Sequence, residues 1–185
     1  MDERQLLKDC IGGDSKAQKR LYDAFAPKMY GVCLRYASDR DTAQDYLQEA
    51  FIRVFDHLDR FRFEGSLEGW IRKVVVNTAL EKIRKVDVFK NSTGLENVSQ
   101  TNYDVVHLED QINATELLHL IQTLPTGFRT VFNLYAIEGY THQEIATMLN
   151  INEGTSKSQY SRARHWLKDR LEKNAIRDGR AERSN

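Results

Sequence analysis

The chain has 185 residues, 41% hydrophobic and 29% charged, and its 27 basic and 27 acidic side chains give a formal net charge of zero. This length suffices for two small domains or one medium core. No segment approaches the roughly twenty consecutive apolar residues of a transmembrane helix. The N-terminus, MDERQLLKD, is acidic and polar where a signal peptide is basic and then apolar. We therefore expect a cytoplasmic protein without a membrane segment of its own.

Residues typical of catalytic and metal sites are scattered along the chain. Cys10 and Cys33 lack the CxxC or Cys/His spacing of metal ligands, so we expect two reduced thiols and no metal site. No glycine-rich phosphate loop is present. No nucleophile or carboxylate completes a catalytic set with any histidine, at His57, His107, His119, His142 or His165. The sequence predicts a protein that is not an enzyme and needs no cofactor.

Helical spacing of apolar residues runs through the first half of the chain. Gly12 and Gly13 end a first short helix, and Asp14 or Ser15 can cap the second. The run of three valines from Val74 suggests a strand, but the apolar spacing over a longer window favours a helix. Four helices are expected, over residues 2–11, 15–36, 42–59 and, from 67 or 70, to 86.

The third predicted helix carries apolar residues on two sides. One face consists of Ala43, Leu47, Ala50, Val54 and Leu58. Outside that face, further apolar side chains alternate with polar ones, namely Tyr46, Phe51, Ile52 and Phe55. The pattern leaves two interpretations open: a helix buried on two sides within its own domain, or a helix that binds a protein partner.

A loop rich in aromatic residues and arginines, RFRFEGSLEG over residues 60–69, precedes the fourth helix. The exposed side of that helix is expected to carry Arg72, Lys73, Asn77, Lys82, Arg84 and Lys85. Aromatic rings beside cations suit single-stranded nucleic acid, because bases stack on rings while the backbone meets positive charge. By residue type alone, Phe61, Phe63 and Trp70 fit the alternative of ordinary core residues better.

Periodicity disappears over residues 87–108, where Asn, Ser, Thr and Gly are frequent, and we expect a polar linker there. Two helices follow over residues 109–123 and 125–138, the second with Pro125 in its first turn. The inward side of the second helix is expected to carry Phe128, Val131, Phe132 and Tyr135. From residue 174 the chain is charged and aperiodic, which predicts a frayed tail.

Residues 141–171 have the pattern of a DNA-reading helix-turn-helix. Thr141 and Glu144 form a capping box, Asn150 suits the left-handed backbone of a tight turn, and Asn152 can cap the second helix. That helix is expected to bury Tyr160, Ala163, Leu167 and Leu171. Its outward side then presents short polar groups for base edges and cations for phosphates, namely Thr155, Lys157, Ser158, Gln159, Ser161, Arg162 and Arg164. The alternative is an ordinary solvated amphipathic helix.

Charge is segregated along this neutral chain. Residues 157–183 contain nine Lys or Arg against four Asp or Glu, residues 72–85 contain five against one, and residues 39–59 lean acidic. Affinity for nucleic acid comes largely from neutralised phosphates. We infer two basic surfaces for nucleic acid, one acidic surface for a protein partner, and weak DNA binding by the chain alone.

Three segments in this order and spacing resemble the extracytoplasmic-function sigma factors of bacteria, a group of the sigma-70 family. They are DTAQDYLQEAFIRVFDHLDRFR from Asp41, GSLEGWIRKVVVNTALEKIRK from Gly65, and LPTGFRTVFNLYAIEGYTHQEIATMLNINEGTSKSQYSRAR from Leu124. The resemblance covers about residues 3–172. It implies an all-α fold of two helical domains joined by a flexible polar linker, with sigma region 2 at residues 1–86, the linker at 87–108, region 4 at 109–173 and a charged tail at 174–185.

The resemblance also implies partners and site residues. The third helix would dock on the beta-prime clamp of core RNA polymerase through Asp45, Tyr46, Gln48, Glu49, Phe51, Arg53 and Phe55. The loop and fourth helix would melt the minus-10 element of promoter DNA and bind its single strand through Phe61, Arg62, Trp70, Lys73, Val74, Asn77 and Lys82. The helix-turn-helix would read the minus-35 element as duplex through Thr155, Ser156, Lys157, Ser158, Gln159, Ser161, Arg162 and Arg164. The beta flap of polymerase and an anti-sigma factor are further expected partners.

The chain departs from the family pattern at Asn150, where a turn glycine is usual, and at two positions in the reading helix. Ser156 and Gln159 stand where relatives often have an apolar residue and an arginine. Glutamine suits the major-groove edge of adenine, whereas arginine suits guanine or a phosphate. We therefore predict a minus-35 preference different from that of arginine-bearing relatives.

Two other classes of protein fit part of the pattern. A free-standing helix-turn-helix regulator, with the first domain as a sensor or dimerisation module, predicts tight duplex binding without polymerase and a palindromic site. The neutral charge and the two basic surfaces count against it. A helical adaptor that binds only proteins predicts that Lys157, Arg162 and Arg164 can be neutralised together without loss of function.

Overall fold

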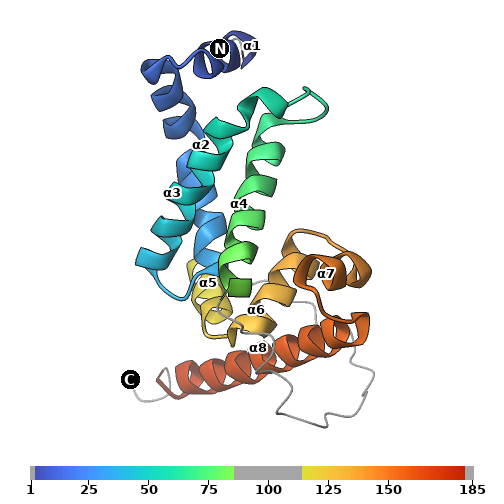
Figure 1. Cartoon of the computed structure of the whole chain (residues 1–185). Helices are drawn as coiled ribbons and strands as arrows, with labels where there is room; N and C mark the ends of the chain where they lie inside the picture. The colour runs from blue at the N-terminus through green and yellow to red at the C-terminus, as the bar shows by residue number, and fades with distance from the viewer. Residues whose placement is uncertain (1–2, 86–113, 182–185) are drawn as a thin grey trace. The chain divides into compact units, whose positions relative to one another are not determined.

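The computed structural model of the chain describes residues 3–85 and 114–181, and every secondary-structure element within those ranges is helical (Figure 1). The chain divides into two compact units, Met1–Lys85 and Val86–Asn185. The predicted all-α fold with two helical domains is confirmed. The linker expected over residues 87–108 lies outside the described ranges. None of the helices within those ranges is long and apolar enough to cross a membrane.

Three long helices of the first unit pack side by side, with a short helix across one end (Figure 1). The elements are α1 (Glu3–Ile11), α2 (Ser15–Tyr36), α3 (Arg40–Asp56), the 3₁₀ turn η1 (Leu58–Arg60) and α4 (Leu67–Lys85). Each pair among α2, α3 and α4 is in contact, and α1 packs on α2 and η1. The third helix ends at Asp56, before the predicted end at residue 59, because the chain tightens into η1.

Side-chain caps fix where the long helices begin. The Oδ1 atom of Asp14 accepts a hydrogen bond from the Lys16 N–H at 2.7 Å and caps α2, as predicted. Asp39 caps α3, where its Oδ1 accepts from the Thr42 N–H at 2.7 Å. Hydrogen bonds from Ser38 and Thr42 lower the pKa of the Asp39 carboxyl to about 2. The cap of α3 is therefore charged at neutral pH, where it also suits the helix dipole.

Apolar residues from the facing sides of α2, α3 and α4 form the core of the first unit. Its large buried members include Leu21, Met29, Tyr36, Val54, Leu67, Ile71, Val75 and Val76. The valine run therefore belongs to a helix, as its spacing predicted. Cys10 and Cys33 are also buried, as free thiols, and desolvation raises the pKa of Cys33 to about 12.

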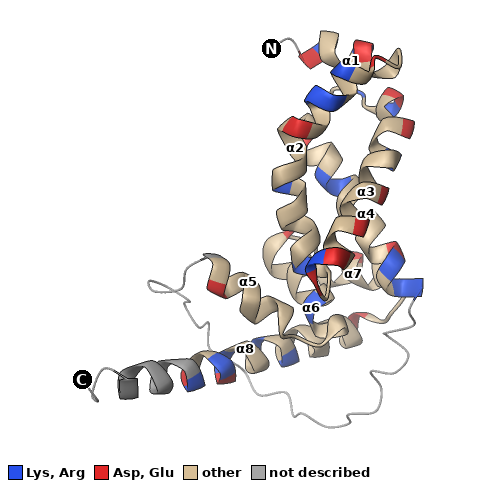
Figure 2. Cartoon of the chain, turned by 90° about the vertical axis from the view of Figure 1, so that its left-hand side faces the viewer, with Lys and Arg blue, Asp and Glu red and all other residues tan. Residues whose placement is uncertain are grey.

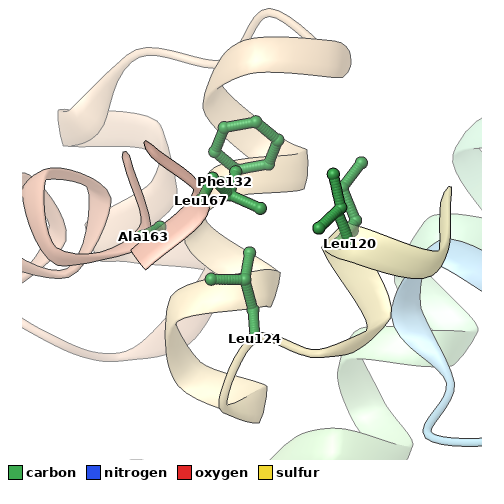
Figure 3. Close-up of a cluster of buried hydrophobic side chains, with 6 residues drawn as sticks. Leu120, Leu124, Phe132, Ala163 and Leu167 are labelled. Carbon is green, nitrogen blue, oxygen red and sulfur yellow. The ribbon is translucent and has the colours of Figure 1, made fainter. Parts of the chain in front are cut away.

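The second unit is organised around its last helix. Its elements are α5 (Ala114–Gln122), α6 (Thr126–Phe132), the π-helix η3 (Asn133–Ile137), α7 (His142–Leu149) and α8 (Glu153–Ala181). Helices α5, α6 and α7 each contact α8. Figure 3 shows Leu120, Leu124 and Phe132 pointing toward Ala163 and Leu167 of α8, and all five are buried. The predicted DNA-reading helix thus packs against three other helices.

Two predictions for this unit are wrong. The helix expected over residues 125–138 is α-helical only to Phe132, after which Glu138 N–H bonds to Asn133 O at 2.9 Å in the wider π turn. That turn changes the direction of the following side chains, so Tyr135, expected inward, is 39% exposed. The tail expected from residue 174 is helical as far as Ala181. Residues 109–113 lie outside the described ranges.

Candidate nucleic-acid interface

The helix-turn-helix begins at the predicted capping box. The Thr141 hydroxyl accepts a hydrogen bond from the Glu144 N–H at 3.2 Å, and the Glu144 carboxylate accepts one from the Thr141 N–H at 2.8 Å. The backbone bond lowers the pKa of Glu144, because it favours the charged form. Helix α7 buries Ile145 and Leu149, while Ala146, also expected on this face, is half-buried.

Asn150 makes the turn between α7 and α8. Its φ of 54° and ψ of 47° are left-handed values that asparagine tolerates. The Ile151 N–H donates to Ala146 O at 3.0 Å and closes the end of α7. Asn152 Oδ1 then accepts from the Thr155 N–H at 2.6 Å at the start of α8. The predicted box, turn and second cap are all confirmed.

The buried stripe of α8 starts one turn earlier than predicted. Ser156 and Gln159 are 0% and 3% exposed, and they share one face with the buried apolar residues further along the helix. Ser156 Oγ lies 2.9 Å from His142 Nδ1, and the Gln159 amide lies against Gly127 of α6. The prediction that Ser156 and Gln159 face DNA is therefore wrong. The minus-35 preference argued from Gln159 loses its basis, because the amide does not reach outward.

The other predicted residues of α8 lie outside the buried stripe. Lys157 and Ser158 are exposed, and the half-buried ones are Thr155, Ser161, Arg162 and Arg164. Lys157 pairs with Glu153, one turn earlier, at 2.7 Å. The Arg164 guanidinium lies 5.9 Å from the Tyr160 ring centre. Figure 2 shows Lys and Arg at several points along α8. The side of α8 away from its buried stripe, called its open side below, carries polar and cationic groups.

The loop between η1 and α4 holds a cluster of aromatic rings. The Phe61 ring centre lies 5.0 Å from that of Phe63 and 5.9 Å from that of Trp70. Phe61 is 7% exposed and so packs as a core residue, whereas Phe63 is 44% exposed. Phe63 also has a φ of 57°, and the Arg4 guanidinium lies 5.1 Å from its ring centre. Sequence spacing did not single out Arg4, because α1 is brought to the loop by tertiary packing.

An open cavity of about 240 Å³ lies beside these rings. Its lining consists of Arg4, Leu7, Lys8, Ile11, Leu58, Asp59, Phe61 and Phe63. Ile11 and Phe63 are 54% and 44% exposed, so the hollow leaves apolar surface open to solvent. It adjoins the loop predicted to meet the minus-10 element, and half of its lining residues come from α1.

One face of α4 gathers most of the residues predicted for the minus-10 strand. Trp70, Val74 and Asn77 follow one another at helical spacing, with Lys73 beside them. Lys73 and Asn77 are exposed, whereas Trp70 and Val74 are half-buried. Arg62, in the loop before α4, is exposed. This face thus offers a ring, an amide and a cation within two turns of helix.

Helix α3 combines the two interpretations that its pattern left open. Phe51 is 2% exposed, with its ring centre 4.7 Å from that of Tyr22 in α2, so its predicted exposure is wrong. Ile52, which was not among the predicted docking residues, is 58% exposed. The predicted residues that keep exposed or half-buried surface are Asp45, Tyr46, Gln48, Glu49, Arg53 and Phe55. Phe51 is thus internal, and Ile52 is an apolar residue that α3 exposes on its surface.

An ion-pair network joins α3 to α4. Arg53 contacts Glu49 at 3.1 Å and Glu81 at 2.5 Å. Lys82 lies 3.8 Å from Glu49, and Lys85 lies 3.1 Å from Glu81. The hydrogen bond from Arg53 is the main reason that the pKa of Glu81 falls to about 2. Glu49 and Arg53, predicted for polymerase, and Lys82, predicted for DNA, thus belong to one network.

Comparison with known proteins places both units. Residues 21–88 match the family Sigma-70 region 2, and residues 114–167 match the family Sigma-70, region 4. The chain is 32% identical over 179 residues to the ECF RNA polymerase sigma factor SigW of Bacillus subtilis, covering 91% of this chain and 96% of that protein. It is 28% identical to the RNA polymerase sigma-H factor of Pseudomonas aeruginosa, covering 92% and 94% of the two chains.

A solved structure has the same fold. The sigma factor RpoE, in complex with the anti-sigma factor NepR from Bartonella quintana, aligns at a TM-score of 0.51 and 21% identity, covering 83% of this chain and 96% of that chain. The family assignment rests on the sequence matches, which span nearly the whole chain at up to 32% identity. The chain therefore belongs to the extracytoplasmic-function family of RNA polymerase sigma factors, which act in transcription initiation.

Proposed function

We propose that this chain directs core RNA polymerase to promoters with a minus-35 and a minus-10 element and opens them. Region 2, residues 1–86, binds polymerase and the minus-10 element, and region 4, residues 109–173, reads the minus-35 element and meets the beta flap. Residues 87–108 link the two regions, and residues 174–185 form the C-terminal end of the chain. The observation that carries the proposal is the complete helix-turn-helix in one unit together with an aromatic, cation-flanked face in the other.

The open side of α8 supports duplex reading. Thr155 and Ser158 supply short polar groups near the helix N-terminus, and Lys157, Arg162 and Arg164 supply charge for phosphates. Lys157 pairs with Glu153, one helical turn away, and the lysine side chain is 62% exposed. Such a pair contributes only about 0.3–0.5 kcal/mol. A DNA phosphate can therefore replace the carboxylate at little cost.

The face of α4 supports capture of a single strand. Extruding a base costs about a few kcal/mol, which contacts to the base must offset. Trp70 and Val74 offer stacking and apolar contact, Asn77 offers an amide to a base edge, and Lys73 offers a cation to the strand. Phe61 supports the Trp70 ring from inside the fold, since it is buried.

The open surface of α3 supports docking on the beta-prime clamp. Asp45 and Gln48 are exposed, and Ile52 adds an apolar side chain that is 58% exposed. Phe51 fixes α3 against α2 from within and does not contact the partner directly. An acidic surface with an apolar centre suits a partner surface that is basic around an apolar patch.

We also propose an inhibitory partner and a cellular location for the chain. The solved complex of the Bartonella quintana relative contains an anti-sigma factor, and we propose that this chain is inhibited by a protein of that class. The chain works in the cytoplasm, where core polymerase and promoter DNA are found. It carries no catalytic site and no cofactor, since polymerase makes the phosphodiester bond.

Run-off transcription tests the proposed function. Core bacterial polymerase, with and without the chain, is incubated with fragments of the source genome, and transcript starts are sequenced. We expect new starts only with the chain, each preceded by two spaced elements. Duplex binding by the chain alone, without new starts, would instead favour a free-standing regulator. Binding to polymerase without any DNA-dependent effect would favour a protein-only adaptor.

A further inference from the structure

The first turns of α8 rest on two buried polar side chains. Ser156 contacts α7 through its hydroxyl, 2.9 Å from His142 Nδ1. Gln159, three residues on, contacts α6 at Gly127. Both side chains lie on the same face of α8 and are almost fully buried, at 0% and 3% exposure. Contacts to two different helices fix both the rotation of this part of α8 and its distance from α6.

The contact at Gly127 leaves no room for a side chain unless the Gln159 amide moves. A Cβ atom at this position would lie 2.7 Å from Gln159 Oε1 and 3.5 Å from its Cδ and Nε2. Gly127 is in α6 and is not among the glycines with positive φ, so its backbone does not demand glycine. Within a helix, glycine is about 1 kcal/mol less favourable than alanine. A side chain at residue 127 would therefore have to displace the Gln159 amide.

The shape of Gln159 matters more than its polarity in this contact. Among the described residues, no group donates a hydrogen bond to its Oε1 atom. The amide therefore fills the gap between α8 and α6 without an oxygen contact that an apolar chain of equal length would lose. Methionine has a similar unbranched length and adapts to irregular spaces, so it should fill the gap as well.

We propose that Gln159 and Gly127 form a spacer that sets how far the reading half of α8 stands from α6, and so determines minus-35 specificity without touching DNA. The inference rests on the proposed reading of the minus-35 element by α8. Hydrogen bonds to base edges operate over about 2.7–3.2 Å. A displacement of α8 by a fraction of an ångström or more therefore changes whether Thr155 and Ser158 reach a base.

Four variants of the full chain test the spacer: Gln159→Met, Gln159→Ala, Gly127→Ala, and Gly127→Ala combined with Gln159→Ala. Each is assembled with core polymerase and transcribes a promoter library with a fixed minus-10 element and a randomised minus-35 element. The measured quantities are the selected minus-35 motif and the ratio of transcription from the best promoters to transcription from the average promoter of the library. Thermal unfolding of each variant checks that it folds.

We expect Gly127→Ala to lower that ratio about ten-fold, comparable to the loss of one base-specific contact. The double variant should recover most of it, because the smaller residue 159 makes room for the new methyl group. Gln159→Met should keep the wild-type motif and ratio. Gln159→Ala should weaken the ratio at several base positions together, because the helix loses its support.

Several outcomes overturn the spacer. They are an unchanged ratio in Gly127→Ala, a double variant no better than Gly127→Ala, or a Gln159→Met variant that loses preference at one base position. The last would mean that the amide reads a base. If Gly127→Ala does not fold, the comparison of Gln159→Met with Gln159→Ala decides alone, since neither introduces a clash. A wild-type protein indifferent to the minus-35 element refutes the proposed reading itself, and the spacer with it.

Discussion

The two faces proposed for nucleic acid hold their cations in different ways. On α8, ion pairs join residues one turn apart, as between Lys157 and Glu153 at 2.7 Å. On α4, Glu81 pairs with Lys85 of its own helix at 3.1 Å and also with Arg53 of α3 at 2.5 Å. The pair of Lys157 on α8 is local, whereas Glu81 of α4 also pairs with the helix proposed to dock on polymerase.

This difference bears on when each face can take DNA. A local, exposed pair contributes about 0.3–0.5 kcal/mol, so a phosphate displaces its carboxylate easily. Each carboxylate of the α3–α4 network contacts two cations. Glu49 contacts Arg53 and Lys82, and Glu81 contacts Arg53 and Lys85. We therefore expect Lys157 of region 4 to exchange its carboxylate partner for a duplex phosphate at little cost. Lys82 of region 2 should become available to DNA when polymerase engages Glu49, its carboxylate partner.

The largest effect should come from removing the α8 cations together. Lys157→Ala, Arg162→Ala and Arg164→Ala in one chain should lower transcription from a two-element promoter about 100-fold, because three phosphate contacts are lost. The dependence of log affinity on log salt should fall by about 0.9 per contact. Run-off transcription and duplex binding over a salt series measure both quantities.

A matched control uses cations further along the same helix. Lys168 and Lys173 are exposed on α8, and their double replacement by alanine should leave promoter selection nearly unchanged. If the control loses as much activity as the triple variant, net charge of the chain explains the result and the reading half of α8 has no special role.

A smaller effect is expected at the α4 face. Asn77→Ala removes an exposed amide and should slow promoter opening about ten-fold, the order of one lost contact to an extruded base. Polymerase binding should be unaffected. Phe61→Ala is a poorer test, because truncating a buried phenylalanine costs about 3–5 kcal/mol. Fluorescence of a labelled minus-10 base follows opening, with Gln44→Ala, an exposed amide on α3, as control; weaker polymerase binding by the Asn77 variant would contradict the assignment.

The features that sequence predicted are those whose partners lie within a few residues. Thr141 and Glu144 bond to each other, and Asn150 makes a turn by its own backbone conformation, so both were evident from local pattern. Gln159 was misplaced because its burial depends on Gly127 in another helix. A polar residue type indicates solvent only when no distant element leaves a space that it can fill.

The same physical reason explains the other errors. The apolar arc of α3 contains Phe51 and Ile52 in succession, and only packing against Tyr22 of α2 decides that the aromatic one is internal. The π-helix after Phe132 changes which side chains face inward without any signal in composition. Helix α8 continues to Ala181, although the sequence from residue 174 has no apolar periodicity to indicate a helix there.

A modest effect should come from loosening the α3–α4 network. Glu81→Gln removes a carboxylate partner from Arg53 and Lys85, so the free chain should bind a single-stranded minus-10 oligonucleotide about three-fold more tightly. The gain should shrink in the assembled polymerase complex, where α3 is already engaged. Fluorescence anisotropy measures both affinities. An equal gain in the free and assembled protein would show a general charge effect and no link between docking and DNA binding.

The smallest expected effect is a change in thermal stability with pH, which tests whether ion pairs hold α3 to α4. The pKa of Glu81 is about 2 in the folded chain against an ordinary 4.5. A depressed pKa means that its ion pairs contribute fully above pH 4.5 and that this contribution is lost as pH falls toward 2. Glu81→Gln lacks the contribution at every pH, so its thermal midpoint should lie slightly below that of the wild type near neutrality and converge with it in acid. Asp23→Asn, which removes the same charge from an exposed pair with Lys19, controls for net charge. A constant offset between wild type and Glu81→Gln down to pH 2 would mean that packing, and not the ion pairs, joins the two helices, and the contrast between the two nucleic-acid faces would then lack its physical basis.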